Sequence, residues 1–479
     1  MKNVNLVYNV SDKPGLWKTL VFALQQVLAI LAATIVVPVI INGNTLDLFN
    51  KGKLEFVAEM SQSAALLGAG VGTIIYLLFT KFKSPVFLGS SFAFLGSMTA
   101  AFAGAVSASV GYLGLIIGAV MAGLVYVIIS IIVKFAGVNW ISKIMPASVI
   151  GPTVAVIGLS LAGNAIKDSV AYSQISTEYV MSTGNILALV CALVTFATVV
   201  ICSVYGKKML KIIPFIIGIG AGYALASIFT VIGHLAGADA LKIIDFSMFT
   251  RMKWLPDFTF VAAIDGFSNL GNFGAYLGTV AVAYVPVAFV VFAEHLADHK
   301  NISSIIGTDL TKDPGLHRTL LGDGVGSMVG AFFGGCPNTT YGESVGCVAI
   351  SGNASVVTIF TAACICIVAA FIAPFTTLLA TIPGCVMGGV CITLYGFIAV
   401  SGLKMIQKVD LSDNANLFTV SSILIAGVGG MKLVFGEITV TAVACALILG
   451  ILTNLISTKL FKKSAKAVSE EIVEEDKAE

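Results

Sequence analysis

Apolar residues gather into long runs that almost no charge interrupts, and this feature limits the possible fold more than any other. Residues 111–133, for example, contain no charged side chain, and a helix needs about 20 apolar residues to cross the hydrocarbon core of a bilayer. In the whole chain of 479 residues 57% are hydrophobic and 11% are charged, whereas about a quarter of the residues are charged in a soluble globular domain. The sequence therefore predicts a chain that crosses a membrane many times.

Fourteen apolar segments can be marked out, seven on either side of a polar stretch between residues 234 and 272. The first begins directly after a polar N-terminus and is too long for a signal-peptide core, so we expect no cleaved leader. The predicted segments are 16–41, 64–80, 84–105, 111–133, 144–165, 186–205, 212–233, 276–292, 319–335, 341–350, 356–380, 386–400, 417–434 and 438–456.

The basic residues are distributed unevenly between the connections. With the N-terminus inside, twenty of the 27 lysines and arginines lie in the tails and the even-numbered connections, which is the bias typical of cytoplasmic loops. We therefore expect both termini on the cytoplasmic side of a bacterial inner membrane. The net charge of +2 favours no nucleic-acid partner, and none of the nine cysteines has metal-ligand spacing, so no metal, disulfide or cofactor is expected.

Two short segments have sequences that interrupt a membrane helix. The third carries GSSFAF at 89–94 and the tenth opens with PNTTYGE at 337–343, and irregular backbone at membrane depth is tolerated only where it lines a cavity. A second resemblance, MPASVIG at 145–151 and IPGCVMG at 382–388, is also seven segments apart. Seven is odd, so the halves would lie in the membrane as inverted repeats, with a site at the broken helices.

Ionisable residues inside the predicted segments mark candidate functional positions. Glu294 and Asp298, in AEHLADH at 293–299, are four residues apart and share a helix face, and Glu343 belongs to the broken tenth segment. Alternatives are open for three residues of this segment: Asp298 and His299 could end a helix among headgroups, and His295 could be solvated or serve helix packing. For Asp323 a structural hydrogen bond to nearby backbone is the simpler interpretation.

Two carboxylates beside two half-helix N-termini constrain the ligand. The N-termini offer free backbone N–H groups to carbonyl oxygens, whereas carboxylates accept hydrogen bonds and repel anions. A neutral flat ring that alternates N–H and C=O groups, such as uracil, meets both demands, and Phe92 and Tyr341 could stack on it.

At these motifs the sequence resembles the uracil permease branch of the nucleobase/ascorbate transporter family. The resemblance rests on DPGLHR at 313–318, PNTTYGE at 337–343, GSSFAF at 89–94, Ala33-Thr34 before Pro38, MGG at 387–389 and LYG at 394–396.

The resemblance implies an all-α polytopic fold of fourteen segments in two inverted repeats of seven, with short extended strands in the broken third and tenth segments. It implies a core and a gate domain, a homodimer, and uptake of uracil or a related nucleobase driven by protons, with sodium as the other possible ion. The expected divisions are a tail at 1–15, core at 16–135 and 276–380, gate at 136–235 and 381–458, an extracytoplasmic connection at 236–275 and a C-terminal tail at 459–479.

The resemblance also implies roles for individual residues. Glu294 and Glu343 would accept the uracil N–H groups, and the backbone N–H groups of Phe92 and Gly342 would donate to its carbonyls. Three further residues would line the site: Ala33, Tyr341 and Tyr395. Glu294 and Asp298 would carry the coupled proton.

Three positions depart from the family pattern and leave alternatives open. Asp298 stands where uracil permeases have histidine, Ser344 where they have asparagine, and Cys391 where a serine lines the site. Asp298 favours a purine or xanthine carrier. An anion transporter of similar fold is a further alternative, although Glu294 and Glu343 disfavour an anion. No phosphate loop or nucleophile–base pair indicates an enzyme.

Overall fold

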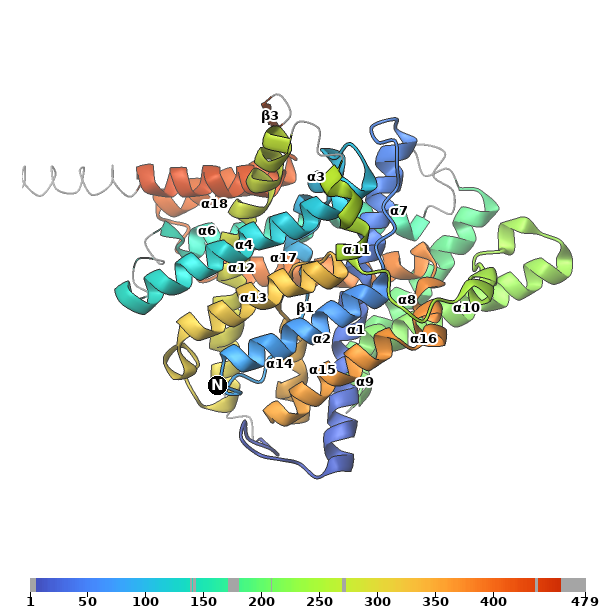
Figure 1. Ribbon diagram of the computed structural model, residues 1–479, viewed down its shortest axis with the longest axis horizontal. Helices are drawn as coiled ribbons and strands as arrows, with labels where there is room; N and C mark the ends of the chain where they lie inside the picture. The colour runs from blue at the N-terminus through green and yellow to red at the C-terminus, as the bar shows by residue number, and fades with distance from the viewer. Residues whose placement is uncertain are drawn as a thin grey trace, which may run out of the picture.

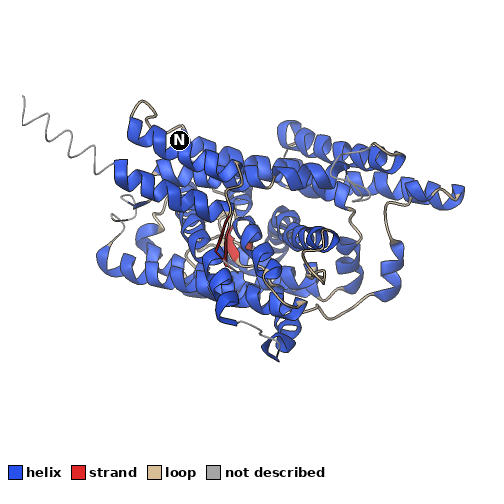
Figure 2. Cartoon of the chain, turned by 90° about the horizontal axis from the view of Figure 1, so that it is seen from above, coloured by secondary structure: helices blue, strands red, loops and turns tan. Residues whose placement is uncertain are grey.

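The computed structural model describes residues 6–137, 140, 144–170, 181–207, 209–268, 273–435 and 438–457. The predicted C-terminal tail at 459–479 and the first five residues of the predicted N-terminal tail lie outside this part of the chain. The described residues form a bundle of helices that surrounds one small pair of strands (Figures 1 and 2).

The first half of the chain runs from α1 to α10. Serine side chains cap several of these helices: Ser61 accepts a hydrogen bond from the start of α2, Ser107 from that of α4 and Ser182 from that of α8. The elements are α1 (Leu16–Asn50), α2 (Gln62–Phe79), β1 (Leu88–Ser90), η1 (Phe92–Phe94), α3 (Leu95–Ala103), α4 (Ala108–Ala136), α6 (Ala147–Ser160), α7 (Ala162–Val170), α8 (Thr183–Tyr205), α9 (Met209–Ile212) and α10 (Pro214–Ala236).

Four short helical turns form the connection between the halves: η2 (Asp239–Leu241), η3 (Phe246–Arg251), α11 (Thr259–Ala263) and η4 (Ile264–Ser268). The second half then comprises α12 (Phe273–Ile306), η5 (Thr311–Gly315), α13 (Leu316–Gly334), β2 (Asn338–Thr340), α14 (Gly342–Ser351), α15 (Val356–Ala370), α16 (Ala373–Ala380), α17 (Gly384–Ile406), α18 (Asn414–Val428), β3 (Leu433–Phe435), β4 (Ile438–Val440) and a last helix, Ala442–Ser457.

Eight helices of the described chain are long and apolar enough to cross a membrane, or nine if the pair α15 and α16, bent by 83°, counts as one span. The chain is therefore a multi-pass membrane protein. Each of the fourteen predicted segments overlaps a helix, but several of these helices are short, such as α14 and α18. The number fourteen therefore stays a prediction.

Several helices differ in length from the predicted apolar segments, and two of them extend well beyond. The first segment was expected to end at residue 41, but α1 continues to Asn50; the eighth was expected to end at residue 292, but α12 continues to Ile306. In both cases the apolar pattern stops before the helix does. The polar residues beyond residue 292 remain helical because neighbouring helices supply hydrogen-bond partners, as His295 and His299 illustrate below.

The strands β1 and β2 pair antiparallel at the centre of the bundle (Figure 2). Gly89 pairs with Thr339 and Ser90 with Asn338. If Phe92 and Tyr341, the aromatic residues that follow the strands, are equivalent, then Gly89 corresponds to Asn338 and Ser90 to Thr339. Under these equivalences the pair Gly89–Thr339 maps onto the pair Asn338–Ser90, which is the other observed pair. A local two-fold axis between the strands requires this symmetry of the register.

Close packing of α2 on α13 holds the strands in place. A Cβ at Gly68 would lie 2.6 Å from the Gly330 carbonyl oxygen, and one at Gly72 would lie 2.8 Å from that of Gly326, so small residues allow the two backbones to touch. Helix α2 also binds both strands: Thr73 Oγ1 accepts from the Leu88 N–H at 2.9 Å, and the Gly68 carbonyl accepts from Asn338 Nδ2 at 2.9 Å.

Helix contacts occur in matching sets in the two halves. The contact of α1 with α15 corresponds to that of α12 with α4, and the contact of α2 with α15 corresponds to that of α13 with α4. The contact of α6 with α18 likewise corresponds to that of α17 with α8. Each contact maps onto its partner when the predicted segments are shifted by seven.

Candidate functional site

A cavity of about 450 Å³ lies beside the paired strands, a size common for small-molecule sites. Its wall is mainly apolar, with three carboxylates on one side. From the expected core it is lined by Ala29, Phe92, Ala93, Glu294, Ala297, Asp298, Thr339, Tyr341, Gly342, Glu343, Gly346, Cys347 and Ile350, and from the expected gate by Val154, Ile157, Ser203, Lys211, Pro214, Phe215, Leu394, Phe397, Ile398, Ser401 and Met405.

Six of the eight predicted site residues line this cavity: Phe92, Glu294, Asp298, Tyr341, Gly342 and Glu343. They come from η1, from α12, and from Tyr341 and the first turn of α14. The structure thus brings together residues that lie up to 251 positions apart in the chain.

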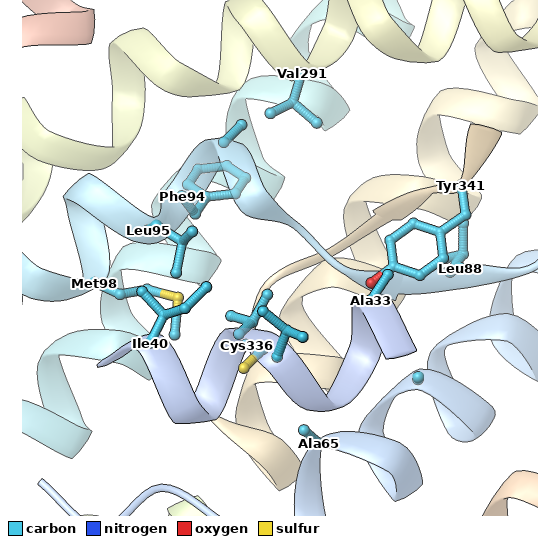
Figure 3. Packing of buried hydrophobic residues seen from close by; sticks show 14 of the residues in the cluster. Ala33, Ile40, Ala65, Leu88, Phe94, Leu95, Met98, Val291, Cys336 and Tyr341 are labelled. Carbon is cyan, nitrogen blue, oxygen red and sulfur yellow. The ribbon is translucent and has the colours of Figure 1, made fainter. Parts of the chain in front are cut away.

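The other two predicted residues, Ala33 and Tyr395, are buried outside the lining. Ala33 lies one turn beyond Ala29 on α1, within the hydrophobic cluster that also holds the Tyr341 ring (Figure 3). Tyr395 packs its ring edge-on against Phe92, with centroids 6.0 Å apart. Leu394 and Ile398 on one face of α17 line the cavity, and a helix turn of about 100° per residue places Tyr395 on the next face.

Asp298 is hydrogen-bonded to strand β2 beside the cavity. Thr340 Oγ1 donates to Asp298 Oδ2 at 2.8 Å. A Cβ built on Gly342 would meet only Asp298 Oδ1, at 3.9 Å, so no packing contact within the protein requires a glycine there. The space in front of Gly342 belongs to the cavity.

Two short helices begin at the ends of the strands. The stretch Phe92–Ala103 follows β1 and α14 follows β2, and neither helix start has a side-chain cap. Their first backbone N–H groups are therefore left for a ligand or water. Gly342 and Glu343 occupy the first turn of α14, so this turn offers both a backbone donor and a carboxylate acceptor.

Ser344 connects three elements behind the cavity. Its hydroxyl oxygen accepts from Gln26 Nε2 of α1 and, at 3.0 Å, from the backbone N–H of Phe87 before β1. Ser344 and Gln26 are both buried. The serine that departs from the family pattern thus holds the start of α14 against α1.

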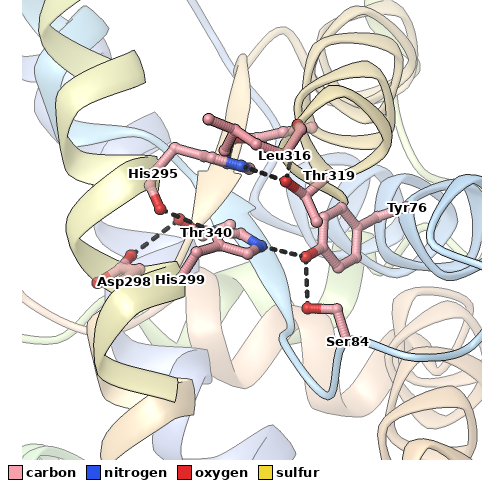
Figure 4. A network of polar contacts seen from close by, with 9 residues as sticks. Tyr76, Ser84, His295, Asp298, His299, Leu316, Thr319 and Thr340 are labelled. Atoms are coloured by element: carbon pink, nitrogen blue, oxygen red, sulfur yellow. Dashed lines mark hydrogen bonds and ion pairs between the residues drawn. The ribbon is translucent and has the colours of Figure 1, made fainter. Parts of the chain in front are cut away.

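A buried polar network lies between α12, α13 and α2 (Figure 4). His299 Nδ1 lies 2.8 Å from the His295 carbonyl, which can only accept, so His299 Nε2 accepts the Tyr76 hydroxyl at 2.6 Å. The Tyr76 oxygen in turn accepts from Ser84 Oγ at 2.6 Å. The interpretation of His299 as a helix end among headgroups is wrong, because it is fully buried.

His295 and Asp323 form a pair in the same network. The Thr319 hydroxyl donates to the Leu316 carbonyl, so it accepts from His295 Nε2 at 3.0 Å. His295 Nδ1 then shares one proton with Asp323 Oδ2 at 2.7 Å. His295 is a helix-packing histidine, as one interpretation held, and it is not solvated. The expected bond of Asp323 to nearby backbone is wrong, because the partner of Asp323 is the His295 side chain.

Sequence reasoning missed several lining residues. Thr339 lay within the PNTTYGE motif but received no role, although strand alternation separates its side chain from Asn338 and Thr340. Phe215, Lys211 and Ile157 had no sequence signal, because only the contacts of α10 with α1, of α9 with α14 and of α6 with α12 bring them to the cavity.

A multi-pass helical protein in which two short helices begin at a central pair of strands beside a cavity has the architecture of a membrane transporter. Residues 17–435 match the family model described as the permease family. The chain belongs to this family, the nucleobase/ascorbate transporters, whose members are transporters and not enzymes.

Similar sequences extend over nearly the whole chain. The chain is 36% identical to a uracil permease of Bacillus caldolyticus over 94% of both chains, and 36% identical to one of Bacillus subtilis over 95% of both. A uracil permease of Escherichia coli is 33% identical over 97% of this chain and 96% of its own length.

Solved structures share the fold at low sequence identity. The transmembrane domain of the cyanobacterial bicarbonate transporter BicA superposes with a TM-score of 0.56 at 16% identity, covering 94% of this chain and 99% of that domain. The murine anion transporter Slc26a9 in its inward-facing state gives a TM-score of 0.62 at 12% identity, covering 94% of this chain and 69% of that chain.

Proposed function

We propose that the protein is a secondary active transporter that takes up uracil with protons across the cytoplasmic membrane. The observation that carries the proposal is the convergence of Glu294, Glu343 and the start of α14 on one cavity. The relatives named uracil permeases support the same substrate.

Uracil fits the donors and acceptors of this cavity. Its two ring N–H groups would donate to Glu294 and Glu343, and its carbonyl oxygens would accept from the backbone N–H groups of Phe92 and Gly342. Phe92 and Tyr341 supply aromatic surface for the ring. Gly342 allows the ring to approach the backbone because it has no Cβ.

Proton coupling is assigned to Glu294 and Asp298. Both line the cavity from α12, one turn apart, and the network around Asp298 includes only one hydroxyl donor, Thr340. No lysine or arginine forms an ion pair with either carboxylate in the described part of the chain. Protonation would remove the charge from a half-buried carboxylate that lacks a cationic partner.

The transporter would consist of a core domain (16–135 and 276–380) and a gate domain (136–235 and 381–458), in two inverted repeats of seven segments. The matching helix contacts and the two-fold register of β1 and β2 support the repeat. We further propose that the protein is a homodimer with cytoplasmic termini.

The cavity opens toward the proposed cytoplasmic side. At one end it reaches Lys211 and Ser401, which are exposed and lie beside the lysine-rich connections near residues 207 and 404. The positive-inside bias supports a cytoplasmic location for these connections, and with it an inward-facing state.

Two other functions remain as alternatives. Asp298, in place of histidine, favours a purine or xanthine substrate. An anion substrate is suggested only by the fold of BicA and Slc26a9, and an anion would lie beside three carboxylates.

Competition for uptake of labelled uracil tests the proposal. Unlabelled uracil should compete strongly, whereas methylation at N1 or N3 should each weaken competition, because a buried acceptor left unpaired costs about 1–3 kcal/mol. Stronger competition by xanthine than by uracil would overturn the uracil assignment. A protonophore should abolish accumulation if the coupling ion is a proton, whereas a requirement for sodium would replace the proton in the proposal.

A further inference from the structure

A pair of polar contacts joins α1 to α7 at the end of the molecule away from the cavity. Lys167 Nζ lies 2.6 Å from Asp47 Oδ1, and Asn164 Nδ2 donates to Asn44 Oδ1 at 3.3 Å. Asn44 and Asp47 are three residues apart, as are Asn164 and Lys167, so each pair occupies one face of its helix. The two helices therefore meet through two successive polar contacts.

These contacts cross the boundary between the proposed domains. Helix α1 belongs to the core and α7 to the gate. Asn44 is also anchored within the core, since its Nδ2 donates to Thr99 Oγ1 of α3 at 3.1 Å. Helix α7 packs on α8 and α17, which both belong to the gate. A separation of core from gate at this end would break both contacts together.

The cavity and these contacts lie at different positions along the same two spans, α1 and the pair α6 and α7. Ala29 of α1 and Ile157 of α6 line the cavity, whereas no residue of α7 and none of residues 42–50 does. The connections that follow α1 and α7 are the first and fifth, which the distribution of basic residues places outside. The path from the cavity to the outside is therefore closed on the side where Asp47 meets Lys167.

We propose that Asp47–Lys167 and Asn44–Asn164 form the outer gate of the transporter, which holds the inward-facing state and must open for uracil to enter from outside. The proposal rests on the proposed function for its substrate. The ion pair is half-buried, with 29% of each side chain exposed, so each contact is weak enough to break during transport.

Lys51 provides a matched control within the chain. It binds the other oxygen of Asp47, Oδ2, at 2.8 Å, but it lies on α1 itself, four residues away. Lys51→Ala and Lys167→Ala therefore each remove one positive charge and one ion pair from the same carboxylate. Only Lys167→Ala breaks a contact between core and gate.

The first experiment needs no substrate. Asn164→Cys is labelled from outside by a membrane-impermeant maleimide, alone and combined with Lys51→Ala, Lys167→Ala or Lys167→Arg. Lys167→Ala should raise the labelling rate about two- to fivefold, the range expected from the loss of one partly exposed ion pair, and Lys167→Arg should restore it. Equal rates in the Lys51→Ala and Lys167→Ala backgrounds would overturn the proposal.

The second experiment closes the gate covalently. A short, reducible bis-methanethiosulfonate reagent joins Asn44→Cys to Asn164→Cys, with each single variant as a control. Cross-linking should abolish uracil uptake, and a reductant should restore it, whereas thermal stabilisation by uracil in detergent should persist because the inner end stays open. Undiminished uptake by the cross-linked protein would refute the gate. Absence of uracil stabilisation in the wild type would instead refute the proposed substrate and leave the labelling experiment decisive for the gate.

Discussion

The Thr340 hydroxyl donates a hydrogen bond of 2.8 Å to Asp298, and this bond links strand β2 to helix α12 directly beneath the cavity. Helix α12 supplies Glu294 and Asp298 to the cavity, and β2 leads through Tyr341 into α14, which supplies Gly342 and Glu343. Movement of α12 relative to β2 would therefore change the spacing between Glu294 and Gly342, the two groups proposed to bind opposite edges of uracil.

Glu294→Gln should separate binding from coupling. Glutamine keeps one acceptor oxygen but cannot take up a proton, so the variant should bind uracil and let it equilibrate without accumulating. Accumulation of labelled uracil in energised cells or vesicles measures this outcome. Asp298→Asn is the comparison: if it alone abolishes accumulation, the proton is carried one turn further along α12, and concentrative uptake by Glu294→Gln would remove Glu294 from the proton path.

Glu343→Gln and Gly342→Val should both remove uracil binding, for different reasons. Glutamine replaces an acceptor oxygen by a donor, whereas valine fills the space in front of the backbone, where only Asp298 now lies within 4 Å. Saturating uracil at 100 times Kd should stabilise the wild type by about 2.7 kcal/mol and neither variant. Normal stabilisation of Glu343→Gln would identify Glu343 as structural.

Gly330→Ala should displace strand β2 through a clash with the Asn338 side chain. Its Cβ would lie 2.3 Å from Asn338 Nδ2, and this amide binds the Gly68 carbonyl. Overpacking of this kind costs about 1–3 kcal/mol, so the thermal midpoint in detergent and the uracil affinity should both fall. Gly220→Ala in α10 is the control, because a Cβ there meets nothing within 4 Å. Equal midpoints for the two variants would show that Asn338 can move without cost.

Tyr76→Phe should weaken the buried network of the core. Loss of the hydroxyl leaves His299 Nε2 and Ser84 Oγ without their partner, at a cost of about 1–3 kcal/mol. The thermal midpoint should fall relative to Tyr205→Phe, which changes a side chain that is 78% exposed. An unchanged midpoint would mean that water or a rotated Ser84 replaces the hydroxyl.

The sequence by itself determined the membrane class and the three carboxylates of the cavity. Apolar runs of about 20 residues can only be helices in lipid, since each backbone group must be bonded within its own segment. Rare carboxylates in such runs are costly, and this cost drew attention to Glu294, Asp298 and Glu343. The small residues around Phe92 and Tyr341 likewise pointed to interrupted helices, where β1 and β2 now lie.

Only the tertiary structure decided which helix faces pack against each other and which line the cavity. Helix α12 continues past residue 292 because α13 and α2 supply partners to its histidines, and local hydropathy contains no information about those partners. Tyr395 and Ala33 lie behind the cavity wall, while Ile157, Lys211 and Phe215 line it. These positions depend on the rotation and approach of packed helices, which are set by contacts between residues far apart in the chain, such as Gly68 with Gly330 and Asp47 with Lys167.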